Sequence, residues 1–249
     1  MYSIKKFALL VTVIILYGFV QEKIPTIYLT GDSTIAEKLT EKKPETGWGE
    51  KLDLFLNGNI KIDNRARNGR STRTFINEGR WQDIINNLNQ GDYVLIQFGH
   101  NDQSKQKLDR YTPPDDFNNN LKKFVTETRS RNALPVLITP VVRRRFNDKG
   151  VFYDVHGEYP DLVRNVAEEF NVPLIDLHKK SKELLINLGE EKSKELFLIL
   201  EPGKYVNYPS GLDDNTHFSE YGAEIVAGLI AQGINELNID LKKYLKEEK

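Results

Sequence analysis

The sequence contains no cysteine among its 249 residues. Disulfide bonds, thiolate metal sites, a cysteine nucleophile and a lipid-modified N-terminal cysteine are therefore excluded. An excess of charge of one sign is also missing, because the sequence has 35 Lys and Arg residues and 36 Asp and Glu residues, and the net charge is -1. A nucleic-acid-binding protein needs an excess of positive charge to meet phosphates, so that class is not expected. Local contact with a polyanion remains compatible with this balance.

The longest apolar run, Phe7–Val20, lies at the extreme N-terminus behind two lysines. It is short for a membrane span, and its layout is that of a secretory signal peptide. Because Tyr17–Val20 lacks the small-x-small cleavage pattern, an uncleaved anchor is the alternative. We predict a signal peptide at 1–21 and one secreted or periplasmic domain at 22–249, with membrane contact only if the N-terminal segment is retained.

Beyond Pro25, short apolar segments alternate with segments of helical periodicity. The expected strands are Thr26–Leu29, Ile60–Asp63, Tyr93–Phe98, Pro135–Thr139 and Val172–Ile175. The expected helices are Trp48–Leu56, Trp81–Leu88, Asp115–Arg131, Tyr159–Phe170, Ser181–Leu188 and Glu220–Leu237. The irregular stretches, expected to be substrate loops, are Glu41–Thr46, Ser104–Pro114, Val142–Gly157 and Leu200–Asp214. Apolar strands without polar alternation are typical of a parallel sheet covered on both faces, so an α/β domain is predicted.

A serine follows the first expected strand in the segment TGDST. A glycine turn at this point would bring Ser33 to the carboxyl edge of the sheet, where open α/β sheets hold their active sites. The alternative is an ordinary strand-to-helix turn in which Ser33 is only a helix N-cap. Asp32 lies too near the turn to be assigned a chemical role, and we expect it to brace the turn.

Two later segments offer hydrogen-bond donors to the same edge. Gly69, in NRARNGRS, has no side chain, so its backbone N–H can approach a bound oxygen closely. Asn101, in QFGHND, follows the third expected strand and offers a neutral amide donor. Gly69 alone can equally be an ordinary turn glycine. His100 is expected to brace its loop.

Asp214 and His217 stand three residues apart just before the last expected helix. On a single turn, the carboxylate can reach one ring nitrogen of the imidazole while the other faces outward. Asp214 can equally be a capping residue. Together with a serine, a glycine and an asparagine at successive strand ends, this pair favours a serine hydrolase site at one sheet edge.

With these motifs the chain resembles the SGNH or GDSL hydrolases, and within them the rhamnogalacturonan acetylesterases. The resemblance extends from Thr26 to about Leu237 and rests on GDST, the glycine of RNGRS, GHND and DNTH. It implies a flavodoxin-like three-layer α/β sandwich with a five-stranded parallel sheet. The G-x-S-x-G elbow of the α/β-hydrolases is missing, which argues against that other esterase fold.

The resemblance also implies the roles of the site residues. Ser33 is the expected nucleophile, His217 the base and Asp214 its partner. The expected oxyanion hole consists of the N–H groups of Ser33 and Gly69 and the amide of Asn101. No cofactor is implied, and no metal is expected, because the four histidines show no ligand spacing; they are His100, His156, His178 and His217.

The expected function is removal of acetyl groups from a plant cell-wall polysaccharide, with rhamnogalacturonan of pectin as the first choice. The alternatives are another extracytoplasmic esterase, acting on xylan acetyl groups, lipids or thioesters, and a sugar-binding module without catalysis. Ser104–Pro114 and Val142–Gly157 are charged and polar, which favours a hydrophilic substrate over a lipid. A binding module would have no need for a nucleophile, a base and oxyanion donors together.

A pectic backbone carries carboxylates, which a nearly neutral protein must meet with local cations. Arginine binds a carboxylate in a bidentate way, so we expect a clamp in one of two clusters. The first is Arg65, Arg67, Arg70 and Arg73, and the second is Arg143, Arg144 and Arg145. Solvated or acid-paired arginines are the alternative. The candidate substrate contacts are Arg70, Arg143, Arg144 and His156.

Overall fold

The computed structural model describes residues 24–247. The predicted signal peptide at 1–21 lies outside the described residues. Within 24–247, no helix is both long and apolar enough to cross a membrane.

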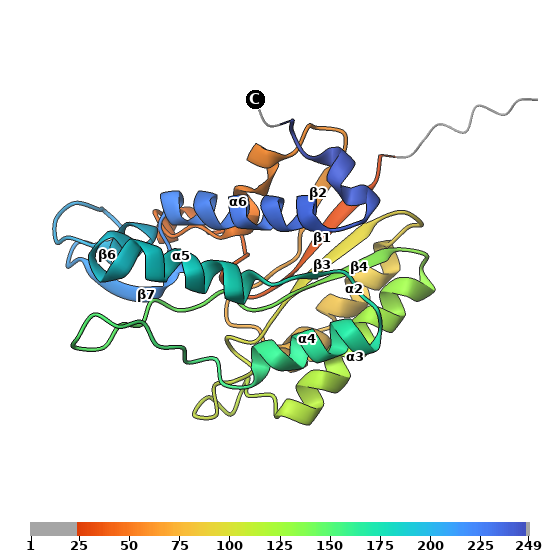
Figure 1. Cartoon of the computed structure of the whole chain (residues 1–249), viewed down its shortest axis with the longest axis horizontal. Coiled ribbons are helices and arrows are strands. Elements are labelled where there is room, and N and C mark those ends of the chain that lie inside the picture. The colour runs from red at the N-terminus through yellow and green to blue at the C-terminus, as the bar shows by residue number, and fades with distance from the viewer. Residues whose placement is uncertain (1–23, 248–249) are drawn as a thin grey trace, which may run out of the picture.

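Five parallel strands form the central sheet (Figure 1). They are β1 (Thr26–Gly31), β2 (Lys61–Asn64), β3 (Tyr93–Gln97), β4 (Leu134–Ile138) and β5 (Leu174–Ile175). Their order is β2-β1-β3-β4-β5, the doubly wound order of flavodoxin-like folds. The strand order reverses between β1 and β3, and ligand crevices open beyond the carboxyl ends of the strands at such a point.

Helices cover both faces of the sheet (Figure 1). One face packs against α1 (Thr72–Asn77), α2 (Arg80–Asn87), α3 (Pro114–Ser130) and α4 (Tyr159–Glu169). The other packs against α5 (Leu177–Lys192), α6 (Glu220–Glu236) and two short 3-10 helices, η2 (Trp48–Glu50) and η3 (Leu52–Phe55). The buried strands form one apolar core with each layer, so the predicted three-layer α/β sandwich is confirmed.

The structure departs from the expected elements in two places near the site. Trp48–Leu56 is not one α-helix but the pair η2 and η3. Gly49 in this segment and Gly47 just before it press against the backbone of Ile35, since a Cβ on Gly47 or Gly49 would meet that backbone at 2.5 or 2.6 Å. The helix α1 was not expected; it begins at a capping box in which Ser71 and Thr74 bond each other's backbone N–H.

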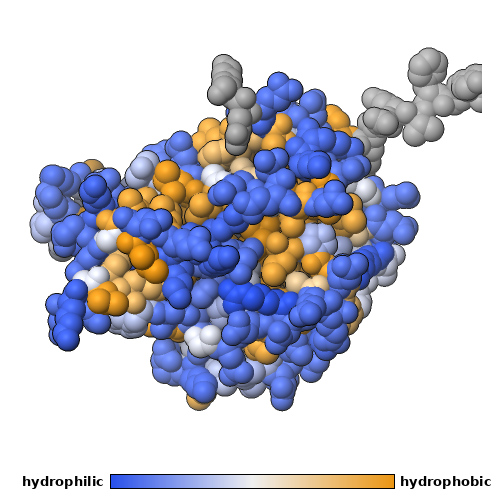
Figure 2. Space-filling model, in the orientation of Figure 1, coloured by the Kyte–Doolittle hydropathy of each residue, from blue (hydrophilic) through white to orange (hydrophobic). Residues whose placement is uncertain are grey.

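A two-stranded antiparallel sheet adjoins the main one. It consists of β6 (Phe197–Leu200) and β7 (Leu212–Phe218), whereas Leu200–Asp214 was expected to be an irregular loop throughout. Short 3-10 helices complete the described chain: η1 (Thr40–Lys42), η4 (Ser193–Leu196) and η5 (Asp240–Tyr244). Figure 2 shows a largely hydrophilic surface on this side, with apolar residues in separate patches.

Candidate active site

A buried network of side chains holds the turn after β1. Asp32 Oδ1 accepts hydrogen bonds from the backbone N–H and the hydroxyl of Thr34, each at 2.9 Å. Gln97, at the end of β3, donates to the Thr34 hydroxyl at 2.7 Å, and Trp48 donates to Gln97 at 3.0 Å. Asp32 therefore braces the turn, as predicted, and the half-buried Ser33 is presented at the sheet edge.

The serine meets a histidine from the other end of the chain. His217 Nε2 lies 2.8 Å from Ser33 Oγ, and His217 Nδ1 lies 2.7 Å from Asp214 Oδ2. Because a carboxylate can only accept, Nδ1 carries the proton and Nε2 is left to accept from the serine hydroxyl. This is the arrangement of nucleophile, base and orienting acid that activates a serine.

Asp214 and His217 lie in β7 and not on a helical turn before α6. The pairing with β6 is interrupted here, since Phe197 pairs with Phe218 whereas the next residue, Leu198, pairs with Asp214. The chain between the two partners bulges. Asp214 Oδ1 fixes the bulge by accepting the backbone N–H groups of Thr216 at 2.8 Å and of His217 at 3.1 Å.

These contacts keep Asp214 ionised. Burial alone would raise the pKa of the carboxyl group, but the hydrogen bond and charge of His217, together with the two backbone N–H groups, bring it down to about 2. The Asp214 carboxylate is thus available to stabilise an imidazolium on His217 throughout the range in which a histidine can act as a base.

The predicted oxyanion donors lie in the loops that follow β2 and β3. Gly69 has a φ of +77°, a left-handed conformation that favours glycine. Among residues 24–247, neither the Gly69 N–H nor the Ser33 N–H donates to a protein acceptor. Asn101 Nδ2 donates one hydrogen bond to the Arg70 carbonyl at 3.0 Å, which leaves its second N–H for a ligand.

Arg143 reaches the segment that carries His217. Its guanidinium donates to Thr216 Oγ1 at 2.6 Å and to the His100 carbonyl at 3.3 Å. In the described range, no carboxylate lies within ion-pair distance of it. Burial lowers the pKa of Arg143, against the attraction of Asp32 and Asp214. Arg70, by contrast, is paired with Glu78 at 2.9 Å.

Two of the expected substrate contacts are buried. Arg144 is 8% exposed and donates to Ser193, Asn215 and the Glu190 carbonyl, so it ties three segments together. His156 is fully buried and bonded to Asp154. Substrate contact by Arg144 and His156 therefore stays a prediction that their burial does not support.

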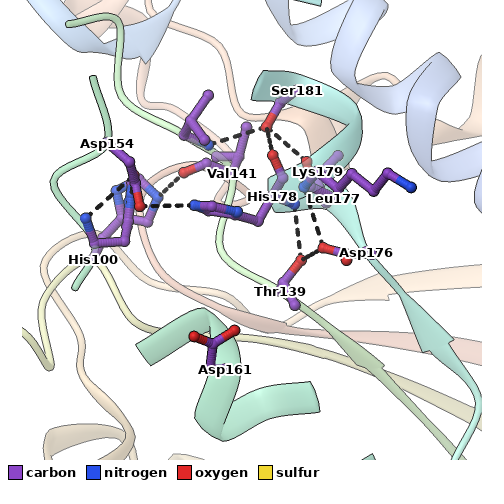
Figure 3. A network of polar contacts seen from close by, with 12 residues as sticks. His100, Thr139, Val141, Asp154, Asp161, Asp176, Leu177, His178, Lys179 and Ser181 are labelled. Atoms are coloured by element: carbon purple, nitrogen blue, oxygen red, sulfur yellow. Dashed lines mark hydrogen bonds and ion pairs between the residues drawn. The ribbon is translucent and has the colours of Figure 1, made fainter. Parts of the chain in front are cut away.

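Three of the four histidines, distant in sequence, gather in space. The rings of His100 and His156 are 4.8 Å apart, and those of His156 and His178 are 5.7 Å apart. Asp154 bonds His156 Nδ1 at 2.9 Å and His178 Nε2 at 3.1 Å. Figure 3 shows Asp154 and His178 directed toward each other, with His100 bonded to Val141 beside them. His100 thus braces its loop, as expected.

Within residues 24–247, Asp154, His156 and His178 have ligand atoms within 4.8 Å of one another and form a group that could hold a metal ion. The second contact of His178 speaks against this use. Arg164 lies 3.4 Å from His178 Nδ1 and can only donate, so Nδ1 accepts and Nε2 carries the proton that a metal would have to displace. We interpret the cluster as a hydrogen-bond network that ties Val142–Gly157 to α5.

Lys38 is a residue of the site that sequence reasoning missed. Its side chain has no exposure and donates to the Ser33 carbonyl. A lysine following a turn is ordinarily solvated, so neither its type nor its position predicts this contact.

Residues 29–225 match the GDSL-like lipase/acylhydrolase family. The rhamnogalacturonan acetylesterase RhgT of Bacillus subtilis is 43% identical over 88% of this chain and 93% of its own length. The probable rhamnogalacturonan acetylesterase YesY of the same species is 39% identical over 90% of this chain and 98% of its own.

Solved structures agree on the fold. YxiM from Bacillus subtilis has a TM-score of 0.74 at 25% identity, over 88% of this chain and 58% of that chain. The acetylxylan esterase Axe2 from Geobacillus stearothermophilus has a TM-score of 0.61 at 20% identity, over 87% of this chain and 95% of that chain. With the family match spanning the sheet and its edge, and two relatives aligned over most of their length, the chain belongs to the GDSL-like lipase/acylhydrolase family and is a carboxylic ester hydrolase.

Proposed function

We propose that this protein removes acetyl groups from a plant cell-wall polysaccharide, and that its substrate is rhamnogalacturonan. The observation that carries the proposed mechanism is the chain of contacts from Asp214 through His217 to Ser33, at 2.7 and 2.8 Å. The substrate class is supported by RhgT and YesY, both of which are named for rhamnogalacturonan and align over most of this chain.

In this mechanism Ser33 Oγ attacks the acetyl carbonyl as His217 Nε2 takes its proton. The negative charge that develops on the carbonyl oxygen is held by the N–H groups of Ser33 and Gly69 and by the free N–H of Asn101. The tetrahedral intermediate then breaks its bond to the sugar oxygen, which receives the proton from His217. Water, deprotonated by the same histidine, hydrolyses the acetyl-serine and releases acetate.

We also propose that the domain works outside the cytoplasm. The support is the N-terminal pattern of two lysines followed by the apolar run Phe7–Val20. Expression of the full chain with N-terminal sequencing of the exported product would locate a cleavage site. Full-length protein retained in the cytoplasm would contradict this part of the proposal.

The deciding experiment compares acetate release from acetylated rhamnogalacturonan, acetylated xylan and a long-chain fatty ester, with Ser33→Ala as the control for background hydrolysis. We expect the highest kcat/KM on rhamnogalacturonan and loss of all three activities in the variant. A preference for xylan would reject the pectin assignment and retain the acetylesterase. Unchanged activity in Ser33→Ala would reject the mechanism.

A further inference from the structure

Lys38 is a buried cation in direct contact with the proposed nucleophile. Its side chain has no solvent exposure. Nζ donates to the Ser33 carbonyl oxygen, to Asn68 Oδ1 at 2.9 Å and to Glu45 Oε1 at 2.8 Å. An ammonium group has three N–H donors, so every one of them is used.

The three acceptors come from three separate segments. Ser33 lies in the turn after β1, and Asn68 directly precedes Gly69 in the loop after β2. Glu45 lies in the segment between η1 and η2 and is itself buried. One contact therefore ends on the residue that supplies the proposed nucleophile, and another ends on the residue directly before Gly69, a proposed oxyanion donor.

The cost of burying the Lys38 ammonium group indicates that its hydrogen bonds do more than fill space in the core. Burying an ammonium group is costly, and an apolar side chain of the same length would fill the space without that penalty. Burial lowers the pKa of Lys38, against the hydrogen bond and charge of Glu45. One carboxylate balances the charge, while the two remaining donors are directed at uncharged oxygens of Ser33 and Asn68.

We propose that Lys38 is a positioning residue. It holds the Ser33 turn and the Asn68–Gly69 peptide at the separation at which the N–H groups of Ser33 and Gly69 can both bind the oxyanion of the reaction. This inference rests on the proposed function of Ser33. The bond to the Ser33 carbonyl restrains rotation of the backbone that carries the hydroxyl and the N–H. The bond to Asn68 restrains the loop whose next N–H belongs to Gly69.

The test uses Lys38→Met, Lys38→Arg and, as a matched control, Lys180→Met. Lys180 is also an ion-paired lysine with low exposure, but it lies on α5 and pairs with Glu236. With p-nitrophenyl acetate as substrate, we expect Lys38→Met to lose about 10- to 100-fold in kcat with little change in KM, since a small displacement of reacting groups costs this much. Lys38→Arg should recover part of the loss, and Lys180→Met should match wild type.

A second comparison asks how Lys38 acts, and its first arm, Asn68→Ala against wild type, does not depend on Lys38→Met folding. Asn68 is exposed, so Asn68→Ala should remain folded while it frees one arm of the contact. We expect Asn68→Ala to lower kcat by a smaller factor than Lys38→Met, and the double variant to be no slower than Lys38→Met alone. Losses that multiply in the double variant would contradict the proposal that Lys38 acts through Asn68. Wild-type kcat in Asn68→Ala would contradict a role for the loop after β2 in positioning.

Melting temperatures separate positioning from folding, because a merely structural lysine would lower stability and leave the kcat of the folded fraction unchanged. A folded Lys38→Met with wild-type kcat, or an equal loss in Lys180→Met, would overturn the proposal. Ser33→Ala is assayed in parallel. Activity that survives in Ser33→Ala would reject the proposed function and the positioning role together, whereas normal kcat in Lys38→Met with an inactive Ser33→Ala would reject the positioning role alone.

Discussion

The imidazole of His217 touches both other members of the proposed triad, and this double contact predicts how substitutions combine. Without the base the Ser33 hydroxyl is a weak nucleophile, and without the hydroxyl the base has nothing to deprotonate. Ser33→Ala and His217→Ala should each lower kcat on the order of 10⁶-fold, and the double variant should lose little more. Acetate release by the three purified variants checks this. Losses that multiply would contradict a shared role.

A second residue-scale prediction concerns Asn101. Its one uncommitted N–H is available to a developing oxyanion, so Asn101→Ala should lower kcat by roughly 10²- to 10³-fold with little change in KM. Steady-state kinetics on a small acetyl ester measures both constants. Asn120→Ala is a comparison variant, since its amide donates to Thr72 away from the serine. A rise in KM alone would place Asn101 in substrate binding instead.

Among the elements, the junction between β3 and α1 depends on a carboxyl group that is poorly suited to ionise. Asp102 Oδ1 accepts from the N–H of Thr72 at 2.9 Å and from its hydroxyl at 2.6 Å, at the start of α1. Burial raises the pKa of Asp102 to about 7, although these hydrogen bonds oppose the shift. The folded protein therefore keeps a proton on Asp102 that the unfolded chain, with a carboxyl pKa of 3.8, has lost.

This difference predicts the direction of a pH effect. Between about pH 4 and about pH 7 the folded state binds more protons than the unfolded state, so the contribution of Asp102 to the free energy of unfolding falls as the pH rises. Asp102→Asn keeps an oxygen for Thr72 but does not titrate. Urea unfolding across this range should show a smaller decline for the variant than for wild type. Parallel curves would contradict the raised pKa.

The elements also show which patterns can be read from sequence. β3 was predicted because Tyr93–Phe98 is a near-continuous apolar run, and the residues of β3 are buried in the sheet. β7 was not predicted, because the acidic and polar residues of DDNTH do not favour a strand and the element exists through its long-range pairing with β6. The segment after Gly47 has helical spacing, but it lies close against the backbone of Ile35 and forms 3-10 turns instead.

For the candidate site, motifs separated by whole elements were sufficient to choose Ser33, Asp214 and His217 before their distances were known. Burial was not foreseeable in the same way. Arg143 and Arg144 are adjacent in sequence, yet Arg144 is enclosed by hydrogen bonds whereas Arg143 reaches Thr216, the residue before His217. Lys38 shows the same difficulty, since a buried lysine is recognised by what surrounds it and these partners come from distant segments.

At the scale of the whole molecule, the charge of -1 leaves the recognition of an acidic polymer to single cations. Arg143, which has no carboxylate at ion-pair distance within 24–247 and is bonded to Thr216 next to His217, is the arginine that we expect to bind a uronate. Arg143→Ala should weaken action on acetylated rhamnogalacturonan by about 1.5 to 3 kcal/mol in kcat/KM, the range for a hydrogen bond to a charged group. Activity on neutral acetylated xylan should stay close to wild type.

The control for this prediction is Arg70→Ala, because Arg70 already has a partner in Glu78. Arg70→Ala should not lower kcat/KM on either polymer by a comparable amount. Equal losses on both polymers in Arg143→Ala would mean that the guanidinium supports the part of β7 that carries Thr216 and His217 and does not bind the carboxylate.

The hydrogen bond between Ser33 and His217 joins residues 184 positions apart. A ribosome-bound chain therefore exposes its serine long before the histidine has been synthesised. Even when β1 to β5 are complete, the sheet edge holds Ser33 without His217, and only the late hairpin of β6 and β7 brings the proposed base to it. Esterase activity thus reports that synthesis has passed β7, and a product truncated before β7 is expected to be inert toward esters.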